Sequence, residues 1–127
     1  MRRSTLTLLT ERGGRTIAIE IPESVAEHRA GLMFRRSVPE YTGMLFLYPR
    51  AQEVTMWMKD THVSLDMVFI KADGLVHRIE AETSPLSRTV VPSRGDVVAV
   101  LELAAGSALH LALKPGDLVV HPAFAAG

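Results

Sequence analysis

The sequence MWMKDTHVSLDMVFI, residues 56–70, contains the single tryptophan of the chain and a dense mixture of charged and apolar side chains. Residues 53–59 alternate with the two-residue period of a half-buried strand, residues 60–64 have the composition of a turn, and residues 66–72 form a second apolar run. We therefore predict a strand–turn–strand corner, around which the rest of the chain is organised.

Further strand and helix patterns flank this corner. Gly13-Gly14 and Asp73-Gly74 are typical of hairpin turns, and Pro49 is predicted to end a short strand. The predicted strands are 4–9, 15–21, 44–48, 53–59, 66–72, 75–82, 97–103 and 118–121; the predicted helices are 23–34, ending near Gly31, and 104–113; a long surface loop is predicted over 84–95. Together they predict a single domain, residues 1–127, of the α+β class: a mostly antiparallel, barrel-like β-sheet with two short helices.

Composition narrows the classes of partner. The 127 residues include 14 basic and 14 acidic side chains, so the net charge is zero and a nucleic-acid partner is not expected. The absence of cysteine excludes disulfides and thiolate catalysis. No apolar run reaches the length of about 18 residues that a membrane helix needs, so no membrane insertion is expected. Composition leaves the oligomeric state open.

The predicted corner brings together Trp57, Lys59, Asp60, Thr61 and Asp66. An aromatic ring, a cation and two carboxylates in one place would suit a small polar ligand. The structural alternative is that the tryptophan fills the end of the core, the turn residues hydrogen-bond their own backbone, and the second aspartate caps the strand start. Both interpretations remain open at this point.

Glu102 interrupts the apolar run 97–103, so we expect a buried carboxylate that needs a partner. Arg29 and Lys59 are the candidate partners, and such an ion pair is more often structural than catalytic. On the predicted helix, Arg29 shares an apolar stripe with Val25 and Leu32. Either its stem lies along that stripe with the head in water, or the whole side chain is buried.

Three functions follow as hypotheses. The first is a small polar-ligand binding module with a pocket around Trp57, Lys59 and Asp66. The second is a hydrolase or lyase with Asp66 or Glu102 as general base and Lys59 or Arg29 as the electrophilic partner. The third is a protein-interaction domain.

No cofactor and no metal site are predicted. The five histidines have no i, i+4 spacing, and His62, beside the corner, is the one worth testing as a ligand. The sequence also lacks the G-x-S-x-G, Walker A and G-x-G-x-x-G patterns, which argues against a serine hydrolase and against nucleotide binding.

The order of these motifs resembles that of the DUF192 family, also called UPF0127. The resemblance covers the chain from Arg15 to His121, and its most specific part is the Trp-Met-Lys-Asp-Thr stretch with the Leu-Asp that follows it. Position 60 is aspartate here, where relatives often have asparagine. The segments that carry the resemblance are 29–35, 43–46, 57–61, 65–70, 100–103 with Gly106, and 116–117.

The resemblance implies a small bacterial or archaeal single-domain protein that is rich in β-structure, in a family with no established activity. It marks a signature set of residues without giving any of them a role: Arg29, Trp57, Lys59, Asp60, Thr61, Asp66 and Glu102. Many relatives carry a secretion signal, which implies an extracytoplasmic (periplasmic or secreted) domain whose leader has been removed, whereas a true start at Met1 would imply a cytoplasmic one.

Overall fold

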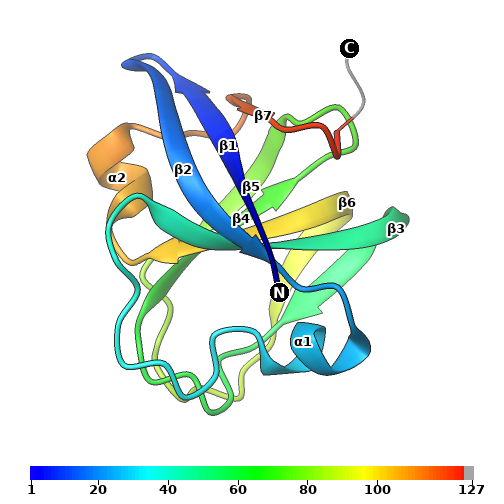
Figure 1. Cartoon of the computed structure of the whole chain (residues 1–127), viewed down its shortest axis with the longest axis vertical. Coiled ribbons are helices and arrows are strands. Elements are labelled where there is room, and N and C mark those ends of the chain that lie inside the picture. The colour runs from blue at the N-terminus through cyan, green and yellow to red at the C-terminus, as the bar shows by residue number, and fades with distance from the viewer. Residues whose placement is uncertain (125–127) are drawn as a thin grey trace.

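The computed structural model describes residues 1–124, which form seven strands and two short helices. The strands form one sheet in the order β5-β4-β6-β3-β2-β1-β7, antiparallel except between β2 and β3 (Figure 1). The predicted fold class is therefore confirmed. The strands are β1 (Arg2–Thr10), β2 (Gly13–Ile21), β3 (Thr42–Met56), β4 (Leu65–Ile70), β5 (Val76–Glu80), β6 (Val91–Ala104) and β7 (Leu118–Val120); the helices are α1 (Val25–Ala30) and α2 (Ser107–Leu111).

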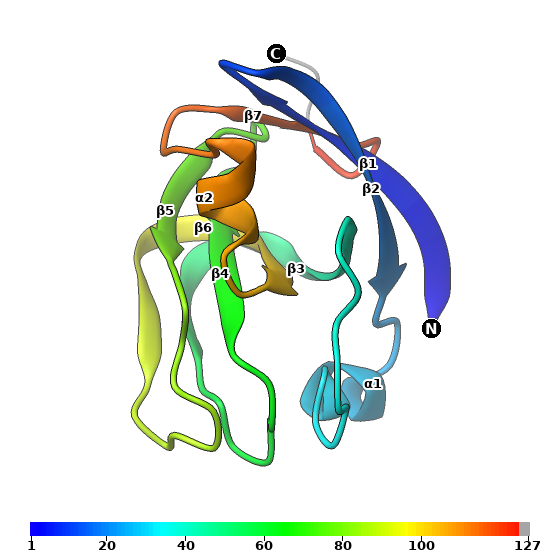
Figure 2. The same ribbon diagram turned by 90° about the vertical axis from the view of Figure 1, so that its left-hand side faces the viewer.

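The sheet curls until its two edge strands meet (Figure 2). An antiparallel bridge pairs Leu75, just before β5, with Leu118 at the start of β7. The Val119 amide donates to the carbonyl oxygen of Gly74 over 2.8 Å, and the Val76 amide donates to that of Asp117 over 2.8 Å. The two edges thus shield one another's backbone groups at one end of a half-closed barrel.

Replacing Gly74 with alanine is expected to lower the free energy of unfolding by about 2 kcal/mol. The residue has φ +88°, and an added Cβ would lie 2.6 Å from the Val119 carbonyl oxygen. Gly13→Ala is the matched control, because Gly13 has a similar φ of +94° but nothing within 4 Å of the added Cβ. Urea unfolding of both variants measures the effect, and equal losses would contradict a contribution from the close approach.

The two faces of the sheet carry separate apolar clusters, because successive side chains of a strand point to opposite faces. The first cluster is covered by β1, β2, β7 and α2; it includes Leu45, Val68, Ile70, Leu101 and Leu103. The second lies toward Leu32 and the segment after β3; it includes Met44, Phe46, Met67, Phe69 and Val100. By the same alternation, Asp66 shares the first face and Glu102 shares the second.

One predicted boundary is wrong: segments 44–48 and 53–59 belong largely to one strand, β3, which runs through Pro49. The pairing of β3 with β6 shifts register between Leu47 and Gln52, so Pro49 lies in an irregularity where the ladder needs no amide donor. The loop predicted over 84–95 is shorter than expected, because β6 already begins at Val91.

The predicted apolar stripe of the first helix is also wrong. Helix α1 buries none of its residues, and Val25 is 71% exposed. Ser24 caps the N-terminus of the helix. The helix ends at Gly31, which is where its end was predicted. Arg29 is exposed, so the interpretation in which its whole side chain is buried is wrong, and the stripe assumed by the other interpretation does not form.

Candidate functional site

A pocket of about 540 Å³ lies between α1, the middle of β3, the segment after β3 and the C-terminal part of β6. Helix α1 and the segment joining β3 to β4 lie at the same end of the sheet (Figures 1 and 2). The lining residues combine two cations, one carboxyl group and several aromatic rings. They are His28, Arg29, Ala30, Gly31, Leu32, Met33, Phe46, Tyr48, Thr55, Met56, Trp57, Lys59, Thr61 and Glu102.

Glu102 is the one buried residue among the charged side chains that line this pocket. It projects from β6 on the face where Met44 of β3 and Met67 of β4 are its direct cross-strand neighbours. Its exposure is 4%, and among residues 1–124 it has neither a hydrogen bond nor an ion pair. No fully buried side-chain nitrogen or oxygen in that part of the chain lacks a partner, so the carboxyl group of Glu102 must be reached from the pocket.

Burial raises the pKa of Glu102 to about 8. An isolated carboxylate loses its hydration in such surroundings, and the neutral acid is then favoured. At neutral pH this side chain therefore carries its proton. The expected ion pair with Arg29 or Lys59 is wrong for the described residues, although both cations line the same pocket.

The outer part of the pocket carries Trp57, Lys59 and Arg29. Trp57 is 45% exposed, so the expectation that it fills the end of the core is wrong. The Lys59 ammonium lies 5.4 Å from the centroid of the Trp57 ring, within the range of a cation–π contact. Thr61 is buried, and its hydroxyl donates to the Lys59 carbonyl oxygen over 3.2 Å, which holds the turn as predicted.

Three aromatic side chains that contact one another form an aromatic wall of the pocket. The His28 ring lies edge-on to Phe46 at 5.6 Å and to Tyr48 at 5.8 Å between centroids. The Tyr48 hydroxyl donates to the Met56 sulfur over 3.7 Å. Burial raises the pKa of Tyr48, and the charge of Glu102 contributes secondly. The Tyr48 hydroxyl therefore interacts electrostatically with that carboxyl group.

Asp66 lies on the opposite face of the sheet from Glu102 and does not line this pocket. It is fully buried, and its carboxylate accepts three backbone N–H bonds: from Glu82 at 2.9 Å, from Gly106 at 3.2 Å and from Ala108 at 2.8 Å. These bonds tie the start of α2 and the segment after β5 to β4. Asp66 is therefore a structural lock for α2, and not a cap of its own strand.

Asp60 and His62 also lie outside the pocket lining. Asp60 has φ +54°, and its carbonyl oxygen accepts the Phe34 amide over 2.9 Å. The His62 ring lies beside that of Phe34 at 6.2 Å between centroids. Of the signature set, the structure thus brings together Arg29, Trp57, Lys59, Thr61 and Glu102, and it separates Asp60 and Asp66 from them.

Three residues that the sequence did not mark as site residues also line the pocket: His28, Phe46 and Tyr48. Phe46 and Tyr48 alternate with Leu45 and Leu47 along β3, so they share a face with Met44 and hence with Glu102. The alternation of these residues is visible in the sequence, but only the pairing of β3 with β6 shows that their face is the one that carries Glu102. His28 gave no signal, because only the packing of α1 brings it to Phe46.

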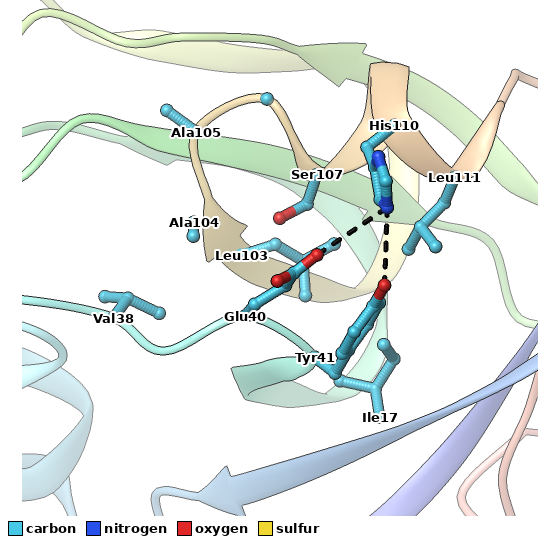
Figure 3. Close-up of a pocket in the computed structure, with 11 residues that line it drawn as sticks. Ile17, Val38, Glu40, Tyr41, Leu103, Ala104, Ala105, Ser107, His110 and Leu111 are labelled. Carbon is cyan, nitrogen blue, oxygen red and sulfur yellow. Dashed lines mark hydrogen bonds and ion pairs between the residues drawn. The ribbon is translucent and has the colours of Figure 1, made fainter.

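A second hollow, of about 310 Å³, lies between α2 and the start of β3 (Figure 3). His110 approaches the Glu40 carboxylate at 3.6 Å and the Tyr41 hydroxyl at 3.3 Å. Their polar groups face one another, and the side chains of His110 and Glu40 are 61% and 64% exposed. These polar groups are exposed to solvent and already paired with one another, so they are weaker candidates for ligand contact than the Glu102 carboxyl group.

Metal ligands and membrane-crossing helices were also sought in the described residues. Within residues 1–124, no group of three or more His, Cys, Asp or Glu side chains is arranged to hold a metal ion. None of the helices in the same region combines the length and the apolar composition needed to cross a membrane.

Comparisons with known proteins place the chain among structural relatives. The family model DUF192, described as "Uncharacterized ACR, COG1430", matches residues 7–121. A crystal structure from Sinorhizobium meliloti 1021, provisionally described as a transcription regulator, is 34% identical with a TM-score of 0.93, covering 97% of this chain and 96% of that one. A protein of unknown function from Novosphingobium aromaticivorans DSM 12444 is 34% identical with a TM-score of 0.90, covering 94% of this chain and 85% of that one. No curated protein sequence is significantly similar.

Proposed function

The chain belongs to the DUF192 family, and we propose that its domain binds a small polar molecule in the pocket above Glu102. The observation that carries the proposal is the carboxyl group of Glu102, which is only 4% exposed, is open to the pocket and has no hydrogen bond or ion pair within residues 1–124. Buried polar groups in folded proteins are almost always hydrogen-bonded, so a group left without a partner is a natural point of ligand contact.

The size and chemistry of the pocket support this proposal. Its volume of about 540 Å³ falls within the range of small-molecule sites, about 300 to 1,000 Å³. Such sites are usually lined by apolar and aromatic side chains with a small number of polar groups, and this pocket has that composition. We assign ligand contact to Arg29, Trp57, Lys59, Thr61 and Glu102. Asp66 is left out, because both of its oxygens are already occupied by backbone amides.

Trp57→Ala is expected to weaken ligand binding at least tenfold while changing the free energy of unfolding by less than about 1 kcal/mol, because the ring is half-exposed and forms the pocket rim. The measurement is a thermal-shift screen of metabolites and sugars against the parent, followed by titration of the compounds that stabilise it.

The matched control for this screen is Phe34→Ala, which removes an exposed aromatic ring that does not line the pocket. A compound that stabilises the parent and the Phe34 variant but not the Trp57 variant places the ligand at the pocket. A compound that stabilises all three proteins equally would contradict this location.

The pKa of Glu102 supports a second candidate function, that of a hydrolase or lyase. A carboxyl group that titrates near neutral pH is suited to transfer a proton as general acid or base. Lys59 or Arg29 would then stabilise developing negative charge. The test is to incubate each stabilising compound with the protein and follow its NMR spectrum. Conversion that disappears in Glu102→Gln supports catalysis, whereas no conversion, or conversion that persists in that variant, contradicts it.

A further inference from the structure

The charged residues that line the pocket differ in burial, because Glu102 is 4% exposed, Arg29 is exposed and Lys59 is half-buried, and this difference bears on the class of ligand. The acid, Glu102, has the thioether side chains of Met44 and Met67 opposite it on the neighbouring strands. The two cations are Arg29 and Lys59, and neither of them forms an ion pair in the part of the chain that the structure describes. The lining therefore combines a nearly buried acid that can ionise with two more exposed cations, and none of the three has an ion-pair partner among residues 1–124.

The surroundings of Glu102 suit an ammonium group. The aromatic rings of Phe46 and Tyr48 line the pocket from the adjacent strand, and aromatic faces attract cations. A ligand ammonium would supply the opposite charge that the buried carboxylate lacks, and charge-assisted hydrogen bonds of this kind are roughly twice as strong as neutral ones.

A ligand with a single type of charge fits this pocket less well. A purely cationic molecule would meet Arg29 and Lys59 as like charges on entering. A purely anionic one would pair with those two cations but would offer no opposite charge to the ionised form of Glu102. A molecule with an amino group at one end and an acidic group at the other satisfies both kinds of charge.

Resting on the proposed function, we propose that the ligand is a small zwitterion whose ammonium group pairs with Glu102 and whose anionic group lies between Arg29 and Lys59. The aromatic wall formed by His28, Phe46 and Tyr48 then contacts the carbon chain between the two charged ends. Amino acids with their charges at opposite ends of the chain are the simplest molecules of this class.

Binding of an ammonium group requires Glu102 to ionise. Because its pKa is about 8, roughly one molecule in eleven is ionised at pH 7 and ten in eleven at pH 9. The apparent dissociation constant scales inversely with the competent fraction, so binding tightens about tenfold between these pH values. Nearly one proton per bound ligand is released at pH 7. The titratable or charged groups that face the same pocket are His28, Arg29, Tyr48 and Lys59. Working at pH 7 and above limits the contribution of histidine protonation.

The experiment is isothermal titration calorimetry with β-alanine, γ-aminobutyrate and ε-aminocaproate, a series that varies the distance between the two charges. Titrations in phosphate and in Tris, whose ionisation heats differ, count the protons released. The matched compounds are butyrate and caproate, which lack the amine, the N-acetylated amino acids, which lack its charge, and butylamine, which lacks the acid. The variants are Glu102→Gln and, as a control, Glu53→Gln, an exposed carboxylate on β3 outside the pocket.

The expected result is binding of at least one zwitterion with release of nearly one proton, tenfold tightening from pH 7 to pH 9, at least tenfold weakening in Glu102→Gln, and no change in Glu53→Gln. Plain acids that bind as tightly as the zwitterions, or zwitterion binding that does not depend on Glu102, would overturn the inference and leave a binding pocket in place. If none of the zwitterions binds while another compound class stabilises the parent through Trp57, the ligand class alone is wrong. If no compound of any class binds, the proposed function fails as well.

Discussion

Asp66→Ala is expected to lower the free energy of unfolding by about 2 to 6 kcal/mol, a large fraction of the stability of a domain of this size. The substitution leaves the amides of Glu82, Gly106 and Ala108 without their acceptor. The buried Ala108 donor costs about 1 to 3 kcal/mol when it loses its partner, and the two part-buried donors cost about 0.5 to 1.5 kcal/mol each. Urea unfolding followed by circular dichroism measures the loss.

The matched control is Asp73→Ala. Asp73 lies in the exposed turn between β4 and β5, and its carboxylate accepts one amide bond, from Leu75 over 3.1 Å. Its removal is expected to cost less than about 1 kcal/mol. If Asp66→Ala cost no more than this control, Asp66 would not be the lock that holds α2 to β4.

The Glu102→Gln variant is expected to become more stable than the parent as the pH rises. For a buried acid with a paired partner and a lowered pKa, the parent would instead lose stability as the pH falls. The pKa of Glu102 is raised from 4.5 to about 8, so between these pH values the folded state binds more protons than the unfolded state. The contribution of the protonated Glu102 side chain to the free energy of unfolding is complete below pH 4.5 and is lost as the pH rises through 8. At about 1.4 kcal/mol per pH unit, the parent loses up to about 5 kcal/mol across this window.

Glutamine has no charge to ionise, so the variant does not suffer this loss. Urea midpoints of the two proteins measured from pH 4 to about pH 9 should be similar at the acid end and then diverge, with the variant more stable at the alkaline end. Glu53→Gln, which alters an exposed carboxylate, should follow the parent throughout. Parallel profiles for the parent and Glu102→Gln would show that Glu102 titrates normally.

Much of the fold could be predicted from local pattern. The alternation of Ile17, Ile19 and Ile21 with polar residues marks β2, and all three are buried. The Asp73-Gly74 turn is readable because glycine takes the positive φ that it needs. The course of β3 through Pro49 could not be predicted, because a proline is tolerated only once the partner strand shifts register beside it, and register is a property of the pair.

The candidate site was predicted only in part, for a similar reason. The sequence marked Trp57, Lys59 and Glu102, since each departs from its apolar surroundings. It could not separate Asp66 from Glu102, because the face on which each carboxylate lies follows from the pairing of β4 with β6. It also gave Arg29 an apolar stripe that α1 is too short and too exposed to form.

The most direct test of this account is to titrate the carboxyl carbon of Glu102 by carbon-13 NMR, with and without saturating ε-aminocaproate. We predict a titration midpoint near pH 8 for the free protein, which moves to lower pH when the ligand ammonium stabilises the charged form. A midpoint near the ordinary glutamate value of 4.5, unchanged by the compound, would contradict the claim that Glu102 is a buried acid that receives its partner from a ligand.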